Sequence, residues 1–168
     1  VTNGNADRGA AIFNAGRLTL LNSTVSNSRA PVDGGGIYNT GSAQIVDSTI
    51  ISNSAQYGAG LYNFGQLTVV RSTISGNRAD VFGSGLENWG NTTIQNSTIA
   101  ENSAAITGGG LYRSGGSVTL TNSTIVSNTA TNYGAGVSGG GIVLANTIVA
   151  NNIAAVNPDI NGPITSQG

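Results

Sequence analysis

A repeat of about 25 residues runs through nearly the whole chain and constrains its fold more than any other feature. One block places an aliphatic residue after one or two small residues, at Ile12, Ile37, Leu61, Leu86, Leu111 and Val137. A second block reads Ser-Thr-Ile or a close variant, with its threonine at Thr24, Thr49, Thr73, Thr98, Thr124 and Thr147. Between the blocks lies a short alternating stretch such as Leu67-Thr68-Val69. Each unit therefore predicts three short strands separated by three bends.

Apolar residues that alternate with polar ones in short runs, bounded by Gly and Asn, are typical of strands and turns and not of helices. A unit this small cannot close its own core, but stacked units pair each strand in parallel with its equivalent about 4.8 Å away. We therefore predict an all-β, single-stranded parallel β-helix of about six rungs. It forms one domain over residues 1–168, with repeats at about 9–154 and a C-terminal tail or cap strand at 155–168.

Strand parity predicts which side chains fill the core. The aliphatic residue of the first block, both ends of the alternating stretch, and the residue after each repeat threonine should point inward. In the last copy this counting places Ile148 inside.

Asparagine also recurs at fixed stations. Four residues after the threonine the chain has Asn53, Asn77, Asn102, Asn128 and Asn151. In a parallel stack, identical amides lie above one another and hydrogen-bond along the axis. We expect a structural Asn ladder at these five positions, and a second one at Asn14, Asn39, Asn63 and Asn88.

These blocks resemble the repeats of a known group of proteins. Gly34-Gly35-Gly36-Ile37 and Gly108-Gly109-Gly110-Leu111 resemble the Gly-Gly-Ala-Ile motif of polymorphic outer membrane protein repeats, and Ile99-x-x-Asn102 resembles its partner Phe-x-x-Asn. The broader likeness is to bacterial right-handed β-helix surface proteins. The resemblance implies a right-handed helix, an extracellular or cell-surface location, and a non-catalytic task such as that of an adhesin segment.

The composition disfavours catalysis. The chain has no Cys and no His, so it lacks thiolate ligands, the usual general base and the commonest metal ligand. The seven acids, which include Asp33, Asp80 and Glu87, are interpreted as solvated surface charges. We therefore predict no enzyme, no catalytic residues, no metal and no cofactor. A polysaccharide lyase-like enzyme is a less favoured alternative, since many parallel β-helices resemble such enzymes.

Aromatic residues gather in one region of the repeat. One column and the position two residues further on predict an outward aromatic stripe made of Phe13, Tyr38, Tyr62, Tyr112, Phe64 and Trp89. Three alternatives remain open for this stripe: loops that cover it, contact with another protein, and binding of surface glycans.

Other surfaces indicate little. A net charge of −1 gives no basic footprint for nucleic acid, and no apolar run of membrane-spanning length occurs. The threonine column resembles one half of an ice-binding array, but its neighbours Ile51, Ala100 and Val126 do not complete it.

The two ends suggest a partner. A solenoid needs polar caps to protect its terminal rungs, and no cap precedes the first repeat. We expect copies of the chain to associate end to end into a fibre, through Val1, Pro158, Ile160, Pro163 and Ile164. The alternative is a stalk or passenger segment of a glycan-binding surface adhesin.

Overall fold

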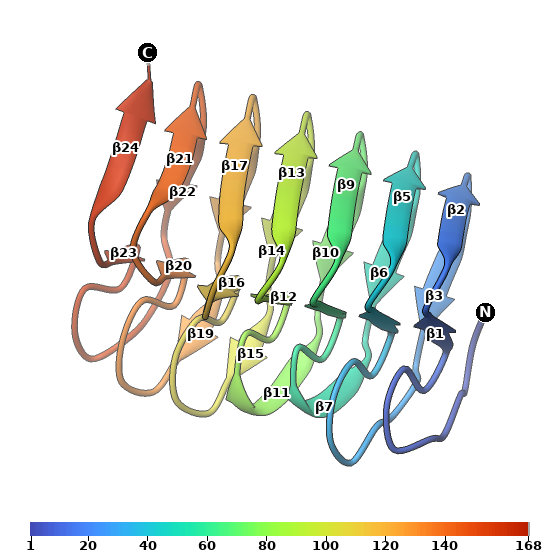
Figure 1. The fold of residues 1–168 in the computed structure, drawn as a ribbon. Helices are drawn as coiled ribbons and strands as arrows, with labels where there is room; N and C mark the ends of the chain where they lie inside the picture. The colour runs from blue at the N-terminus through green and yellow to red at the C-terminus, as the bar shows by residue number, and fades with distance from the viewer. Residues whose placement is uncertain (168) are drawn as a thin grey trace.

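The computed structural model describes residues 1–167 and forms a parallel β-helix whose turns stack along one axis (Figure 1). The chain advances by one turn about every 25 residues, and equivalent strands lie side by side from the N-terminus to the C-terminus. No helix occurs among the described residues, so none is long and apolar enough to cross a membrane. The predicted all-β solenoid is confirmed.

Three long sheets form the sides. The first sheet contains, in order, β1 (Ile12–Asn14), β4 (Ile37–Asn39), β8 (Leu61–Asn63), β12 (Leu86–Asn88), β16 (Leu111–Arg113), β20 (Val137–Ser138) and β23 (Ile160–Asn161). The second contains β2 (Arg17–Leu21), β5 (Ser42–Val46), β9 (Gln66–Val70), β13 (Asn91–Gln95), β17 (Ser117–Thr121), β21 (Ile142–Ala145) and β24 (Ile164–Gln167). The third contains β3 (Thr24–Ser26), β6 (Thr49–Ile51), β10 (Thr73–Ser75), β14 (Thr98–Ala100), β18 (Thr124–Val126) and β22 (Ile148–Ala150).

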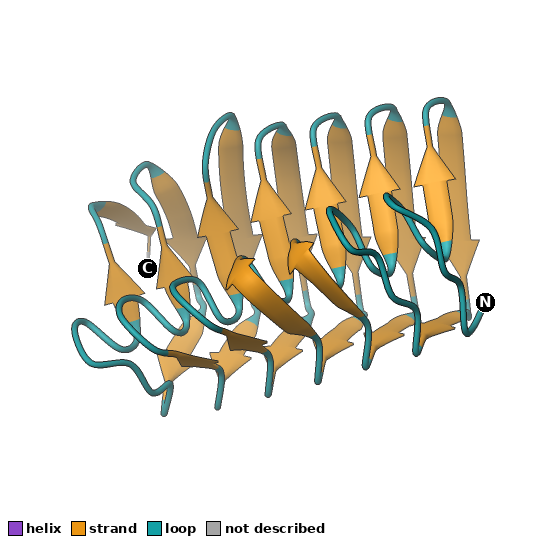
Figure 2. Cartoon of the chain, turned by 90° about the horizontal axis from the view of Figure 1, so that it is seen from below, coloured by secondary structure: helices purple, strands orange, loops and turns teal. Residues whose placement is uncertain are grey.

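A fourth, shorter sheet was not predicted. It contains β7 (Ser54–Tyr57), β11 (Arg78–Phe82), β15 (Ser103–Ala104) and β19 (Thr129–Ala130), which follow the third sheet in the middle turns. Its inward residues are alanines, Ala55, Ala79 and Ala104, which pack in a small cluster of their own. Figure 2 shows the short strands and loops of this side along the length of the solenoid.

The core is narrow and continuous. Ile37, Leu61, Leu86 and Leu111 pair in register along the first sheet, and each is at most 1 % exposed. Full burial of such a side chain contributes about 1.5–3 kcal/mol of transfer free energy, and the stack repeats it in every turn. The packing therefore follows directly from the predicted inward positions.

The last copy departs from the prediction by one residue. Ile148 pairs with Thr124 and is 61 % exposed, whereas Val149 pairs with Ile125 and packs against the core. Thr147 takes the place of the repeat serine, because its hydroxyl donates to the Ala145 carbonyl two residues earlier, as Ser123 does to Thr121. The expected inward position of Ile148 is wrong for this reason.

The bends follow a column of left-handed residues. Between the second and third sheets every turn places one residue at a φ of 46–51°, namely Asn22, Asp47, Arg71, Asn96, Asn122 and Asn146. Asn and Asp tolerate this conformation better than other non-glycine residues, which explains most of the column. Arg71 is the exception, and its guanidinium donates two hydrogen bonds of 2.8 Å to Asp47 one turn away.

Candidate ligand-binding cleft

The outward side of the first sheet carries a stack of aromatic rings. Phe13 and Tyr38 stack with ring centroids 5.3 Å apart, and Tyr38 and Tyr62 stack at 5.4 Å. This spacing follows from the parallel register of β1, β4 and β8, which places equivalent side chains one above another. In the next turn the residue at this station is Glu87, and Tyr112 follows one turn further on. The stack is therefore interrupted by one acid.

A second pair of rings lies beside the interruption. Phe64 and Trp89, two residues beyond the column, stack at 5.9 Å, and Phe64 lies 5.2 Å from Tyr62. Both rings are nearly half exposed, at 47 % and 45 %. They form a wall along the outer side of the first sheet.

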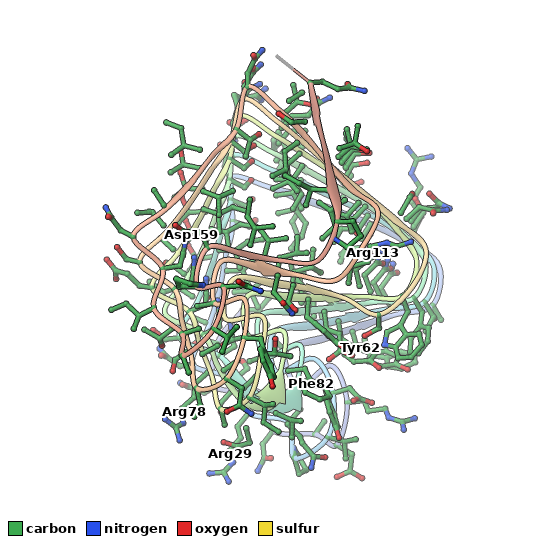
Figure 3. All side chains as sticks on the ribbon, turned by 90° about the vertical axis from the view of Figure 1, so that its left-hand side faces the viewer. Arg29, Tyr62, Arg78, Phe82, Arg113 and Asp159 are labelled. Carbon is green, nitrogen blue, oxygen red and sulfur yellow. The ribbon has the colours of Figure 1, made fainter. Side chains whose placement is uncertain are left out.

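The opposite wall comes from the fourth sheet. Phe82, at the end of β11, lies 5.0 Å from Tyr112 and 5.9 Å from Tyr57 at the end of β7. The register of β11 against β7 shifts between Ala79 and Phe82, and beyond the shift Phe82 pairs with Tyr57. Viewed along the axis, Tyr62 and Phe82 lie on one side of the corner formed by the fourth sheet, and Arg29 and Arg78 lie on the other (Figure 3).

The interruption opens a cleft of ≈ 630 Å³, which we call the Glu87 cleft. It is lined by Arg8, Val32, Asp33, Tyr57, Tyr62, Phe82, Glu87, Trp89, Tyr112, Arg113 and Ser114. Its size is within the range of small-molecule sites, and its lining combines aromatic faces with a few polar groups.

Glu87 is the most unusual residue of the cleft. It is only 2 % exposed. Its Oε1 accepts hydrogen bonds from the Trp89 indole at 3.1 Å and the Ser114 hydroxyl at 3.2 Å. Its Oε2 is buried without any hydrogen-bond partner among the described residues. Burial, the largest effect, and the Asp33 carboxyl together raise the pKa of Glu87 to about 7, against the lowering effect of its two hydrogen bonds.

The other charged side chains of the cleft already have partners within the chain. Arg8 forms an ion pair of 3.0 Å with Asp33 and lies 5.9 Å from the centroid of the Tyr38 ring. Burial raises the pKa of Asp33 despite the attraction of Arg8. The Arg113 guanidinium donates to the main-chain carbonyls of Gly116 and Gly140. Neither arginine hydrogen-bonds or forms an ion pair with Glu87 in residues 1–167.

Comparison with known families agrees with this architecture. The model of the family described as the right-handed β-helix region matches residues 1–125, about three quarters of the chain. The chain belongs to this family. Neither the search of curated proteins nor the search of solved structures gave a match. Membership in the β-helix family confirms the fold and its right-handed sense.

The cleft brings together some of the aromatic residues that the sequence singled out. Tyr62, Trp89 and Tyr112 line it, whereas Phe13, Tyr38 and Phe64 form the adjoining stack. Tyr38 and Tyr62 are only 7 % and 8 % exposed, so part of the predicted outward stripe is covered. Burial, followed by the negative charge of Glu87, raises the pKa of Tyr62.

Four cleft residues were missed or misjudged. The interpretation of the acids as solvated charges is wrong for Glu87 and Asp33, which are 2 % and 7 % exposed, although it holds for Asp80. Tyr57 and Phe82 were not grouped with the stripe because they lie on the unpredicted fourth sheet. One signal was visible: Leu86-Glu87-Asn88 places an acid where the two preceding turns and the following turn have a tyrosine.

The Asn ladder is present with one change of membership. The side-chain amide of Asn53 donates to Asn77 at 3.1 Å, and the same bond repeats from Asn77 to Asn102 and from Asn102 to Asn128 at 2.9 Å. The next member is Asn152 and not Asn151. Asn151 occupies the bend with a φ of 56°, because the last turn is shifted by one residue. The ladder ends on the carboxylate of Asp159, which accepts from the Asn152 amide at 2.9 Å.

The residues proposed for end-to-end contact lie at the two ends of the solenoid. Val1 is 63 % exposed, and its carbonyl accepts from Ser26. The C-terminal tail stacks on the preceding turn as β23 and β24, since Ile160 pairs with Val137 and Ile164 pairs with Ile142. The carbonyls of Pro158 and Pro163 accept hydrogen bonds from the main-chain amides of Gly136 and Gly141, which lie in that preceding turn.

The described residues hold no group of three or more His, Cys, Asp or Glu side chains that could bind a metal ion.

Proposed function

We propose that this chain is a non-catalytic, extracellular β-solenoid that binds a carbohydrate in the Glu87 cleft. The observation that carries the proposal is the grouping of Tyr62, Trp89 and Tyr112 around one buried carboxyl in a cleft of ≈ 630 Å³. Sugars present apolar C–H faces that stack on aromatic rings, while their hydroxyl groups pair with polar side chains. The cleft offers both kinds of contact.

The arrangement of the acids favours binding over hydrolysis. Hydrolysis of a glycosidic bond requires two carboxyls about 5–9.5 Å apart, one of them free to act as base or nucleophile. Asp33 lies two turns before Glu87, a separation of about 10 Å along the axis. Asp33 is also held by Arg8 at 3.0 Å. Asp33, the other carboxyl in the lining, is therefore poorly placed to act as the second catalytic group.

The extracellular location is supported by the resemblance to surface-displayed repeat proteins. Sugars exposed on cell surfaces are accessible to a protein in that location.

The proposal is tested by a glycan array followed by calorimetry on the best ligands. Replacing Trp89 with Ala should weaken binding about tenfold, which corresponds to about 1.4 kcal/mol. The matched control is Tyr133→Ala, because Tyr133 is 47 % exposed, close to the 45 % of Trp89, but lies outside the cleft. Equal binding by both variants and the wild type would refute the site. Release of new reducing ends from a bound oligosaccharide would refute the non-catalytic assignment.

End-to-end assembly is a second candidate, and the C-terminal end supports it. A hollow of ≈ 350 Å³ opens there, lined in part by the core residues Leu144, Val149, Ile160 and Ile164. Another copy stacked on β22 and β24 would cover this apolar surface and pair the outer strand edges.

A further inference from the structure

The Glu87 carboxyl lacks one hydrogen-bond donor. Oε1 has two donors, Trp89 and Ser114, whereas Oε2 has none among residues 1–167. A buried carboxylate oxygen without a donor is unfavourable, because it has lost its water and gained no partner. A ligand that supplies a donor at this point relieves this deficit.

No neighbouring strand or loop in residues 1–167 supplies a positively charged donor to Oε2 of Glu87. Glu87 shares the cleft with Tyr62 on β8, Tyr112 and Arg113 on β16, and Tyr57 and Phe82 on β7 and β11. Arg8, Val32, Asp33, Trp89 and Ser114 complete the lining. Arg8 is paired with Asp33, and Arg113 is bound to main-chain carbonyls. The two titratable groups that interact electrostatically with Glu87, the Asp33 carboxyl and the Tyr62 phenol, carry no positive charge. No side chain of the described residues therefore donates to Oε2, and a cationic donor that reaches this oxygen would pair with it.

The walls of the cleft favour the same kind of ligand. Tyr62, Tyr112 and Trp89 surround the carboxyl, and the faces of aromatic rings attract cations, most strongly where water is excluded. A neutral hydroxyl gains little from such faces, and an anion would place a second acceptor beside Oε2 instead of the donor that this oxygen lacks. An ammonium group gains from both the rings and the carboxylate.

Resting on the carbohydrate-binding function proposed above, we propose that the ligand is an amine-bearing sugar whose ammonium group pairs with Oε2 of Glu87. The sugar ring stacks against Trp89. Oε2 is out of contact with solvent, so this pairing requires a side chain of the lining to move when the ammonium group binds. The pair is then formed in a dry environment, where loss of either partner is costly.

The test compares two series of sugars, and within each series the members differ only in the substituent on carbon 2. Short oligosaccharides of glucose, N-acetylglucosamine and glucosamine with the same linkage, and the corresponding galacto series, are titrated by calorimetry at pH 6 and about 0.15 M ionic strength. We expect the amine form to bind at least tenfold more tightly than its hydroxyl and acetamido counterparts. At this pH Glu87 is largely protonated, since its pKa is raised to about 7. Binding of the amine should therefore release about one proton, measured in buffers of different ionisation enthalpy.

The matched variants are Glu87→Gln and Asp80→Asn, which remove one acid each. Asp80 is exposed and lies outside the cleft. Glu87→Gln should abolish both the preference and the proton release, while Asp80→Asn should retain them. Equal binding of the three forms, or a preference that survives Glu87→Gln, would overturn this inference and leave the carbohydrate function standing. Failure of all six sugars to bind would also overturn this inference, while the glycan array decides the carbohydrate function separately.

Discussion

The burial of Glu87 predicts a specific dependence of stability on pH. The pKa of this carboxyl rises from 4.5 to about 7 on folding, chiefly because burial penalises the charged form. Each unit of difference corresponds to about 1.4 kcal/mol, so the ionised carboxyl destabilises the folded chain by about 3 kcal/mol. Glu87→Gln keeps the shape of the side chain and removes the ionisation, and with it this penalty.

The sign follows from comparing the folded and unfolded chains. Below pH 4.5 the carboxyl is protonated in both, and the penalty is absent. Between pH 4.5 and 7 the unfolded chain loses its proton while the folded chain keeps it, so the free energy of unfolding falls as the pH rises. Above pH 7 the full penalty is present. The variant should therefore gain about 3 kcal/mol relative to wild type between pH 4 and pH 8.

Urea unfolding at pH 4, 6 and 8 measures this gain, with the fluorescence of Trp89, the one tryptophan of the chain, as the probe. A constant offset between the two proteins reflects altered hydrogen bonds with Trp89 and Ser114 and does not affect the test. Glu101→Gln is the matched control, because Glu101 is exposed. Its unfolding free energy should run parallel to that of wild type. A Glu87→Gln curve that also runs parallel from pH 4 to pH 8 would refute the reasoning.

Two further predictions concern the stack itself. Asn102→Ala should lower the free energy of unfolding by about 3 kcal/mol, because it leaves the Ile74 carbonyl and the Asn77 main-chain amide without their partner. Asn132→Ala, at an exposed position, should change this free energy little. Equal stability of the two variants would contradict this expectation. If copies stack end to end, the sedimentation coefficient of the chain should rise with protein concentration. Ser166→Arg, which changes a residue lining the C-terminal hollow, should suppress this rise. A wild-type chain that stays monomeric at every concentration would contradict the assembly.

Most of the fold could be predicted from the sequence because an aliphatic residue recurs at the same inward-facing position in successive turns. Ile50, Ile74, Ile99 and Ile125 follow the repeat threonine and are all at most 1 % exposed. The fourth sheet escaped notice because its inward residues are alanines, which do not stand out in an alternating pattern. Local alternation predicts strands that bury large side chains better than strands that bury small ones.

The last turn shows where counting along a repeat fails. Motif spacing placed Ile148 inside and Asn151 in the ladder, whereas the structure uses Val149 and Asn152. Thr147 occupies the position that serine has in the earlier turns, where its hydroxyl donates to the Ala145 carbonyl. This hydrogen bond sets the register of the last turn, and counting Thr147 as the repeat threonine gives the wrong register. Both errors have this one cause.

The cleft depends on contacts between distant parts of the sequence. The acid at Glu87 was visible as a break in the aromatic column, but its burial requires Trp89, Ser114 from the following turn, and the wall formed by Phe82. No pattern within one repeat contains this information.

The interruption at Glu87 explains how a regular stack can acquire a binding site. Where the column is continuous, the rings lie 5.3 and 5.4 Å apart and leave no room for a ligand between them. Replacing one ring by a shorter acid leaves Tyr62 and Tyr112 two turns apart, about 10 Å along the axis. The backbone keeps its register through this turn, since Leu86 pairs with both Leu61 and Leu111. A single change of side chain therefore opens the cleft and charges its floor without disturbing the core, so the position of Glu87 is better explained by a ligand than by stability.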